Sequence, residues 1–176
     1  MGTAVLPPFQ ALIDRHGSDV LGFLVASVGP HDADDCFQET LIAALRAYPR
    51  LRHAGNLRSW LLTIAHRKAI DHHRSRGRRP EPSGTAADLE QAGKGIDGGP
   101  RSVVAAPEQA AMDAEASGEL WRAVSALPPK QRSSVALRFA TGMTHREIGE
   151  TLDVSEDAAR RNVHEGLKSL REEFAS

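Results

Sequence analysis

Apolar residues near the start of the chain recur at steps of three and four, the spacing of one face of an α-helix. Gly17 lies inside this pattern and can interrupt a helix, so the stretch predicts a helix pair. The same spacing from Cys36 to Tyr48 predicts another helix, which begins beside the acidic cluster of "GPHDADD" and ends at Pro49. The residues that recur on this face of the first stretch are Phe9, Leu12, Ile13, His16, Val20, Phe23 and Leu24.

A third helix is expected after the polar connection "RLRHAGNLR", from Trp60 to about Arg76, with Ser59 as its N-cap. Further along, a helix from about Glu108 to Ala126 is followed by "LPPKQR", where two prolines suit the start of the next helix. That helix is expected to reach Ala140, and Gly142 can cap it. The inward positions of the third helix are Leu61, Leu62, Ile64, Ala65, Ala69 and Ile70.

Two short helices across a tight turn are predicted near the end of the chain. Thr144 and Glu147 form a capping box, and after the turn at Asp153 and Val154, Ser155 caps a final helix. This arrangement is a helix-turn-helix. The expected buried stripe of the final helix is Val163, Leu167, Leu170 and Phe174.

The segment between the two patterned halves holds five glycines and four prolines in 28 residues, too many for a continuous helix. The sequence therefore predicts an all-α fold with two small helical domains joined by a flexible linker. The expected boundaries are 1–79 for the first domain, 80–107 for the linker and 108–176 for the second domain, which carries the helix-turn-helix.

Charge is almost balanced along the whole chain, with 22 Lys and Arg against 23 Asp and Glu, but it is uneven locally. Between His66 and Arg79 there are six basic residues and one acidic residue, a local net charge of +5. Such a block suits phosphate, although a solvated basic tail is an alternative interpretation.

Cys36 is the only cysteine, which excludes an intrachain disulfide and a thiolate metal cluster. No apolar run approaches the ~20 residues that span a bilayer, and the first residues lack the layout of a signal peptide. We therefore expect a cytoplasmic protein with no stable membrane insertion.

The exposed side of the final helix carries side chains that suit DNA. Arg binds guanine edges or phosphate, and His can add a contact, so a major groove is the expected target. The early acids have an alternative role, because Glu156 and Asp157 complement the positive helix N-terminus; Asp157 can also accept from cytosine. The candidate residues are Ser155, Asp157, Arg160, Arg161, His164 and Lys168.

Three stretches together resemble the extracytoplasmic-function (ECF) sigma factors of bacterial RNA polymerase. They are "DADDCFQETLIAALRAYPRL", "SWLLTIAHRKAIDHHRSRGRR" and "LPPKQRSSVALRFATGMTHREIGETLDVSEDAARRNVHEGLKSLRE". The resemblance implies a promoter-specificity subunit that binds core RNA polymerase and promoter DNA and that an anti-sigma factor commonly holds inactive. It implies no cofactor.

The resemblance also implies roles for individual residues. The helix face of Asp34, Asp35, Gln38 and Glu39 is expected to dock on a coiled coil of the polymerase. The recognition helix is expected to bind the -35 element. The residues expected to bind the -10 element, some by phosphate contacts and others in a loop pocket, are His53, Asn56, Arg58, Trp60, Arg67, Lys68, Arg74 and Arg76, with Trp60 also a candidate core anchor.

Four positions depart from the family pattern. Arg67 replaces a common Asn, and Ala158 and Ala159 replace a Thr-Val pair in the recognition helix, where Glu165 also replaces a basic residue. Two other functions stay open: a conventional helix-turn-helix regulator that binds an operator alone, and a sigma-like decoy that sequesters an anti-sigma factor. An enzyme is not expected, because "HRKAIDHH" lacks a zinc-binding spacing and no catalytic motif is present.

Overall fold

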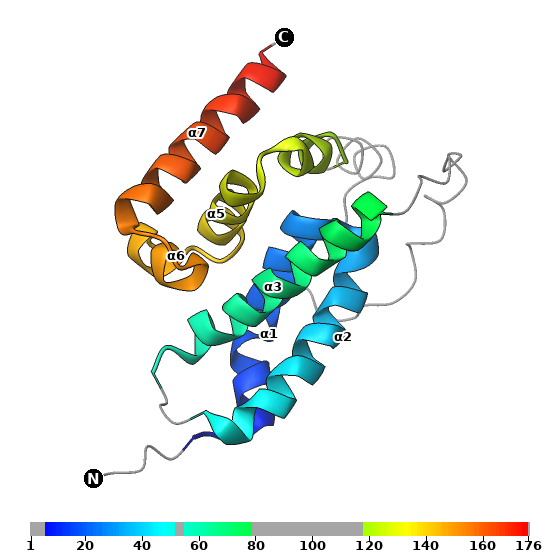
Figure 1. Cartoon of the computed structure of the whole chain (residues 1–176), viewed down its shortest axis with the longest axis vertical. Helices are drawn as coiled ribbons and strands as arrows, with labels where there is room; N and C mark the ends of the chain where they lie inside the picture. Colours follow the sequence, from blue (N-terminus) through cyan, green and yellow to red (C-terminus); the bar gives the residue numbers. More distant parts are fainter. Residues whose placement is uncertain (1–5, 52–54, 79–117, 176) are drawn as a thin grey trace, which may run out of the picture.

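The computed structural model describes residues 6–51, 55–78 and 118–175, and these residues form helices and turns with no β-strand (Figure 1). The fold is all-α, as predicted. The expected linker 80–107 and the loop residue His53 lie outside the described residues. No helix in the described ranges is long and apolar enough to cross a membrane.

Three long helices form the N-terminal domain: α1 (Phe9–Val28), α2 (Pro30–Ala47) and α3 (Leu57–Arg78). Each packs against the other two, and a short 3-10 turn, Tyr48–Arg50, follows α2. Gly29 alone separates α1 from α2, and its φ of 92° is a backbone conformation that favours glycine. The close α1–α2 turn therefore depends on this residue.

Two local predictions for this domain are wrong. Gly17 does not divide α1, which continues through it, and a Cβ there would lie 3.7 Å from the Phe37 ring of α2. That distance is an ordinary van der Waals contact, so Gly17 is simply one residue of a continuous helix that packs against α2. Ser59 does not cap α3, because Asn56 accepts a hydrogen bond from the Ser59 amide at 3.1 Å and the helix begins one residue after Asn56.

The C-terminal domain consists of a helix over 118–126, α5 (Pro129–Ala140), α6 (His145–Leu152) and α7 (Glu156–Phe174). The capping box of Thr144 and Glu147 is present, and Ser155 caps α7 through the Ala158 amide. Asp153 makes the turn with a φ of 55°. The helix-turn-helix is therefore capped as the sequence predicts.

The buried stripe of α7 differs from the prediction at its end. Phe174 is 55% exposed, whereas Ala159, Val163, Gly166 and Leu170 are buried. Gly166 brings α7 close to α5, since a Cβ there would lie 2.7 Å from a methyl group of Val135. Small residues, rather than a longer apolar stripe, set this helix contact.

The two domains pack directly against each other, with α1 against α5 and α3 against α6 (Figure 1). Gly22 of α1 faces Ala140, and Thr63 of α3 donates to the Thr151 carbonyl at 3.3 Å. The Trp121 ring covers Gly29, where a Cβ would be 2.6 Å from it. Buried side chains of both domains form one continuous hydrophobic cluster. We refer to this packing as the closed arrangement.

Candidate nucleic-acid and polymerase interfaces

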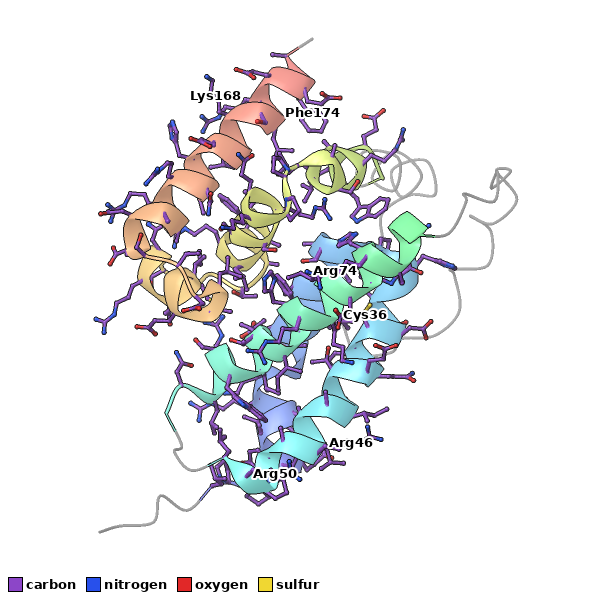
Figure 2. All side chains as sticks on the ribbon, in the orientation of Figure 1. Cys36, Arg46, Arg50, Arg74, Lys168 and Phe174 are labelled. Atoms are coloured by element: carbon purple, nitrogen blue, oxygen red, sulfur yellow. The ribbon has the colours of Figure 1, made fainter. Side chains whose placement is uncertain are left out.

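The outer face of α7 presents the side chains that the sequence assigned to DNA. Asp157, Arg160, Arg161, His164 and Lys168 are all exposed, and Lys168 points outward from the helix (Figure 2). The opposite face is buried against α5 and α6. The predicted division of α7 into a buried and an exposed side is therefore confirmed.

Some charged groups of α7 are paired with each other on the helix surface. Arg160 contacts Glu156 at 2.9 Å and Asp157 at 3.1 Å, and Lys168 lies 3.9 Å from Glu172. Arg161 forms no ion pair with any described residue. Exposed pairs of this kind contribute about 1 kcal/mol or less, so DNA can displace them at small cost.

Two of the departures in α7 have a structural reason. Ala159 is fully buried at the contact between α7 and the rest of the domain, so a larger side chain would have to displace its neighbours. Glu165 accepts a hydrogen bond from Gln131 of α5 at 3.2 Å. Glu165 therefore links two helices of its own domain.

The acidic face of α2 is exposed, and none of its four predicted residues is buried: Asp34, Asp35, Gln38 and Glu39 all face outward. Phe37 and Leu41 are half-buried, and Phe37 packs against the hydrophobic core. The structure adds Ile42 and Leu45, which are 51% and 55% exposed beyond the acids. Sequence reasoning missed these two residues, although their three-residue step from Glu39 to Ile42 to Leu45 was visible.

The basic helix α3 presents Arg67 and Arg74 to solvent, and Lys68 lies half-buried between α3 and α2. Lys68 is 3.7 Å from Glu39, which joins a candidate DNA contact to a candidate polymerase contact. Figure 2 labels Arg74 on α3.

Asp32 at the start of α2 is a contact that the sequence did not assign. Its carboxylate lies 2.6 Å from Arg76 and 3.2 Å from His72, so it ties the far end of α3 to α2. The sequence signal was the acidic cluster at this helix start, whose partner on α3 could not be read without the fold. Arg76 is thus exposed but paired.

Three residues of the expected -10 set have structural partners. Arg58 donates from Nε to Asp19 of α1 at 2.7 Å and from Nη2 to the Thr141 carbonyl of the C-terminal domain. Asn56 caps α3, and Trp60 packs against Tyr48 with ring centroids 5.9 Å apart. In the closed arrangement Arg58 is therefore occupied, and Trp60 serves the core.

Buried titratable groups in this region have shifted pKa values. Burial, followed by the Arg67 charge, lowers the pKa of His66 to about 4, so the ring is neutral at pH 7. Burial, followed by the Glu39 charge, raises the pKa of the Cys36 thiol to about 11. Among the described residues no three His, Cys, Asp or Glu side chains are placed to hold a metal ion.

Comparison with known proteins identifies both domains. Residues 12–79 match the model of Sigma-70 region 2, and residues 123–172 match that of Sigma-70, region 4. The ECF RNA polymerase sigma factor SigX of Bacillus subtilis is 30% identical over 166 residues, which cover 93% of this chain and 81% of SigX. Regions 2 and 4 define a sigma-70-type protein. The chain belongs to the ECF RNA polymerase sigma factors, which confirms the resemblance seen in the sequence.

Other relatives are longer than this chain. It is 30% identical to ECF sigma factor SigE of Mycolicibacterium smegmatis and 31% identical to SigD of Mycobacterium tuberculosis. It covers 63% and 64% of their lengths, respectively. Among solved structures, the sigma factor RpoE in complex with the anti-sigma factor NepR from Bartonella quintana matches 95% of the chain with a TM-score of 0.66 at 19% identity. CnrH in complex with the cytosolic domain of CnrY matches 95% with a TM-score of 0.65 at 22% identity, and both share the fold.

Proposed function

We propose that the chain is a dissociable specificity subunit that directs bacterial core RNA polymerase to particular promoters and initiates transcription there. This proposal rests on one observation: the chain belongs to the ECF family and has two separate exposed faces that suit different partners. One is the acidic face of α2, and the other is the exposed face of α7 that carries Arg160, Arg161, His164 and Lys168. We assign residues 1–79 to polymerase and the -10 element, 80–107 to the linker, and 108–176 to the -35 element.

The α2 face is the proposed polymerase contact. Asp34, Asp35, Gln38 and Glu39 complement a basic surface, and the exposed Ile42 beside them supplies apolar area. Interfaces of this kind use charge for orientation and rate, and apolar side chains for affinity. An acidic face with an apolar continuation is therefore suited to a basic, partly apolar coiled coil.

The DNA contacts are divided between the domains. Arg161 and His164 on α7 are the proposed base-reading residues, since both are exposed and neither forms an ion pair with a described residue. Arg67, Lys68, Arg74 and Arg76 on α3 are proposed to bind phosphates of the opened -10 strand, and the loop residues His53 and Asn56 are proposed to form the pocket for an unstacked base. Arg58 joins this set only when it leaves Asp19 and Thr141.

Regulation and location complete the proposal. Because two structural neighbours are complexes with NepR and CnrY, we propose that an anti-sigma factor also binds this chain. We place the protein in the cytoplasm, where the proposed polymerase partner works. We assign it no catalysis of its own and no cofactor, since its proposed role is to position another enzyme.

Run-off transcription tests this function. Purified bacterial core polymerase and a library of genomic fragments are incubated with or without the protein, and new transcript starts are mapped. We expect discrete starts that require the protein and share upstream sequences at -35 and -10. The variant Arg161→Ala with His164→Ala should lose these starts, whereas Arg46→Ala on the far end of α2 should retain them (Figure 2).

Two results would replace this proposal. Tight binding to core polymerase without new starts would favour a decoy that occupies an anti-sigma factor. Sequence-specific DNA binding without any polymerase binding would favour a conventional operator-binding regulator.

A further inference from the structure

A cleft of about 480 Å³ lies between the two domains. Residues of α3 form one wall, and the first turn of α5 together with the turn between α6 and α7 forms the other. Small-molecule sites commonly have volumes of about 300–1,000 Å³ and often lie at domain interfaces. The cleft therefore has the size and the position of a ligand site, and of its lining residues only Arg74 is also a proposed -10 contact.

The titratable groups that line the cleft are all basic. Arg74, His66 and His73 line it from α3, and Lys130 and Arg132 line it from α5. No Asp or Glu is among its lining residues. The charges of Arg74, Lys130 and Arg132 thus share one cleft with no carboxylate among its lining residues, whereas His66 and His73 have lowered pKa values and are neutral at pH 7.

Two of these groups have buried nitrogens without a partner. Nε of Arg132 and Nδ1 of His66 are inaccessible to solvent, and neither has a hydrogen-bond partner among the described residues. Buried donors normally have acceptors, because an unpaired N–H loses its bond to water on folding. Arg132 is always charged, and its Nη1 and Nη2 already bond His73 and the Leu127 carbonyl, so it contributes a positive charge to the cleft that no carboxylate of the lining neutralises.

The remaining lining is largely apolar. Ile70 of α3 and Leu152 and Val154 beside the α6–α7 turn are half-buried at the cleft. The same site therefore offers cationic donors and an apolar surface. A ligand that satisfies both has an anionic end and an apolar body.

We propose that the cleft binds a small organic anion, a carboxylate or a phosphate monoester on an apolar body, which bridges the two domains. The anionic oxygens would contact the exposed Lys130 and Arg74, with the Arg132 charge behind them, and the body would lie on Ile70 and Val154. Such a ligand stabilises the closed arrangement, because each domain supplies only part of the site. The binding site stands independently of the proposed function, although Arg74 also belongs to the proposed -10 contacts.

Calorimetric titration of the full chain tests the site with three probes that share one alkyl body. Octanoate and octyl phosphate supply the two anionic groups, and octyltrimethylammonium supplies a cation. All are used below their micelle concentrations and at constant ionic strength. We expect saturable one-to-one binding of at least one anion and none of the cation, and the tighter anion identifies the preferred group.

Variants locate the site. The pair Arg74→Gln with Lys130→Gln removes one exposed charge from each wall, and should weaken anion binding by about tenfold or more. The pair Arg46→Gln with Arg171→Gln removes the same charge from each domain outside the cleft, and should leave binding unchanged. Gly22→Phe, which inserts a side chain against Ala140, should also weaken binding by separating the walls.

Three outcomes would overturn the inference. Neither anion binds up to millimolar concentration, or the cation binds as tightly as the anions, or the distant charge pair matters as much as the cleft pair. Unchanged binding in a Gly22→Phe protein whose domains have separated would overturn the bridging role. Failure of run-off transcription would not affect any of these measurements.

Discussion

His73 of α3 and Arg132 of α5 meet across the domain boundary, with 2.7 Å between Nε2 of the imidazole and Nη1 of the guanidinium. The same imidazole nitrogen lies 2.9 Å from the Ser27 carbonyl oxygen. To bond the Ser27 carbonyl, Nε2 of His73 must carry a proton, whereas to accept from the Arg132 guanidinium it must present a lone pair. The Arg132 hydrogen bond therefore needs a neutral His73 with its proton on Nδ1.

This contact predicts that acid loosens the closed arrangement. Burial, and next the Arg132 charge, lower the pKa of His73 below 6.5, while the Ser27 hydrogen bond opposes them and His72 and Arg76 on α3 add to the lowering. A base whose pKa is lower in the folded than in the unfolded state stabilises the folded state fully at pH values above its unfolded pKa. For His73 this stabilisation is lost as the pH falls below about 6.5. Small-angle scattering should show a larger radius of gyration near pH 5 than at neutral pH.

His73→Gln provides the comparison for this pH effect. The glutamine keeps a polar side chain at the boundary but does not titrate, so the acid-induced expansion should be smaller in the variant. An equal expansion in both proteins would assign the effect to other groups, such as His66.

Substitutions at Gly22 should separate the effects of helix stability and domain contact. A Cβ at Gly22 would lie 3.6 Å from the Ala140 carbonyl oxygen and 3.9 Å from its Cβ, which is ordinary contact. Gly22→Ala should therefore keep the closed arrangement and add about 0.5–1 kcal/mol of helix stability. Gly22→Phe should instead open the domains, measured by energy transfer between one dye in each domain. High transfer in both variants would contradict this prediction.

Charge reversal on α2 should separate polymerase binding from folding. Asp35→Lys with Glu39→Lys should weaken binding to core polymerase by about tenfold or more, because the proposed face depends on charge complementarity. Circular dichroism should show unchanged helicity, since both positions are exposed. Asp14→Lys with Glu173→Lys carries the same change in charge elsewhere and should bind normally. Polymerase binding that survives the α2 reversal would show that the docking face lies elsewhere.

Gly149 should be essential for the turn between α6 and α7. A Cβ there would be 2.8 Å from the Val154 carbonyl oxygen, and the Val154 amide donates to the Gly149 carbonyl at 2.9 Å. Gly149→Ala should thus destabilise the domain by about 1–3 kcal/mol in urea unfolding. Gly77→Ala on α3, where nothing lies within 4 Å, should not destabilise. If the two variants were equally stable, the turn between α6 and α7 would have moved to accommodate the added Cβ at no cost in stability.

Much of the fold follows from local sequence rules. The Thr144–Glu147 capping box, the Ser155 cap and the exposed face of α7 were predictable, because each depends on residues within a few positions of one another. The errors at Gly17, Ser59 and Phe174 concern positions that single-residue rules do not decide. Asn56 takes the capping position that Ser59 was expected to hold. α1 continues through Gly17 in contact with α2, and Phe174 ends α7 and stays exposed.

The contacts between the domains could not be predicted from the sequence. His73 and Arg132 are 59 positions apart, and Arg58 and Thr141 are 83 apart, with the expected linker between them. Neither pair belongs to a motif with fixed spacing. The cleft could not be predicted either. The charge of each lining residue is visible in the sequence, but only the packing of the two domains brings these residues together.

The ion pair between Lys68 and Glu39 has a thermodynamic consequence for the proposed function. Polymerase bound to Glu39 would release Lys68 for a phosphate, and DNA bound to Lys68 would release Glu39 for polymerase. Each ligand would then raise the affinity of the other by the same factor, because linkage between two binding sites is reciprocal. An exposed pair 3.7 Å apart contributes about 1 kcal/mol or less, which limits this cooperativity to about fivefold.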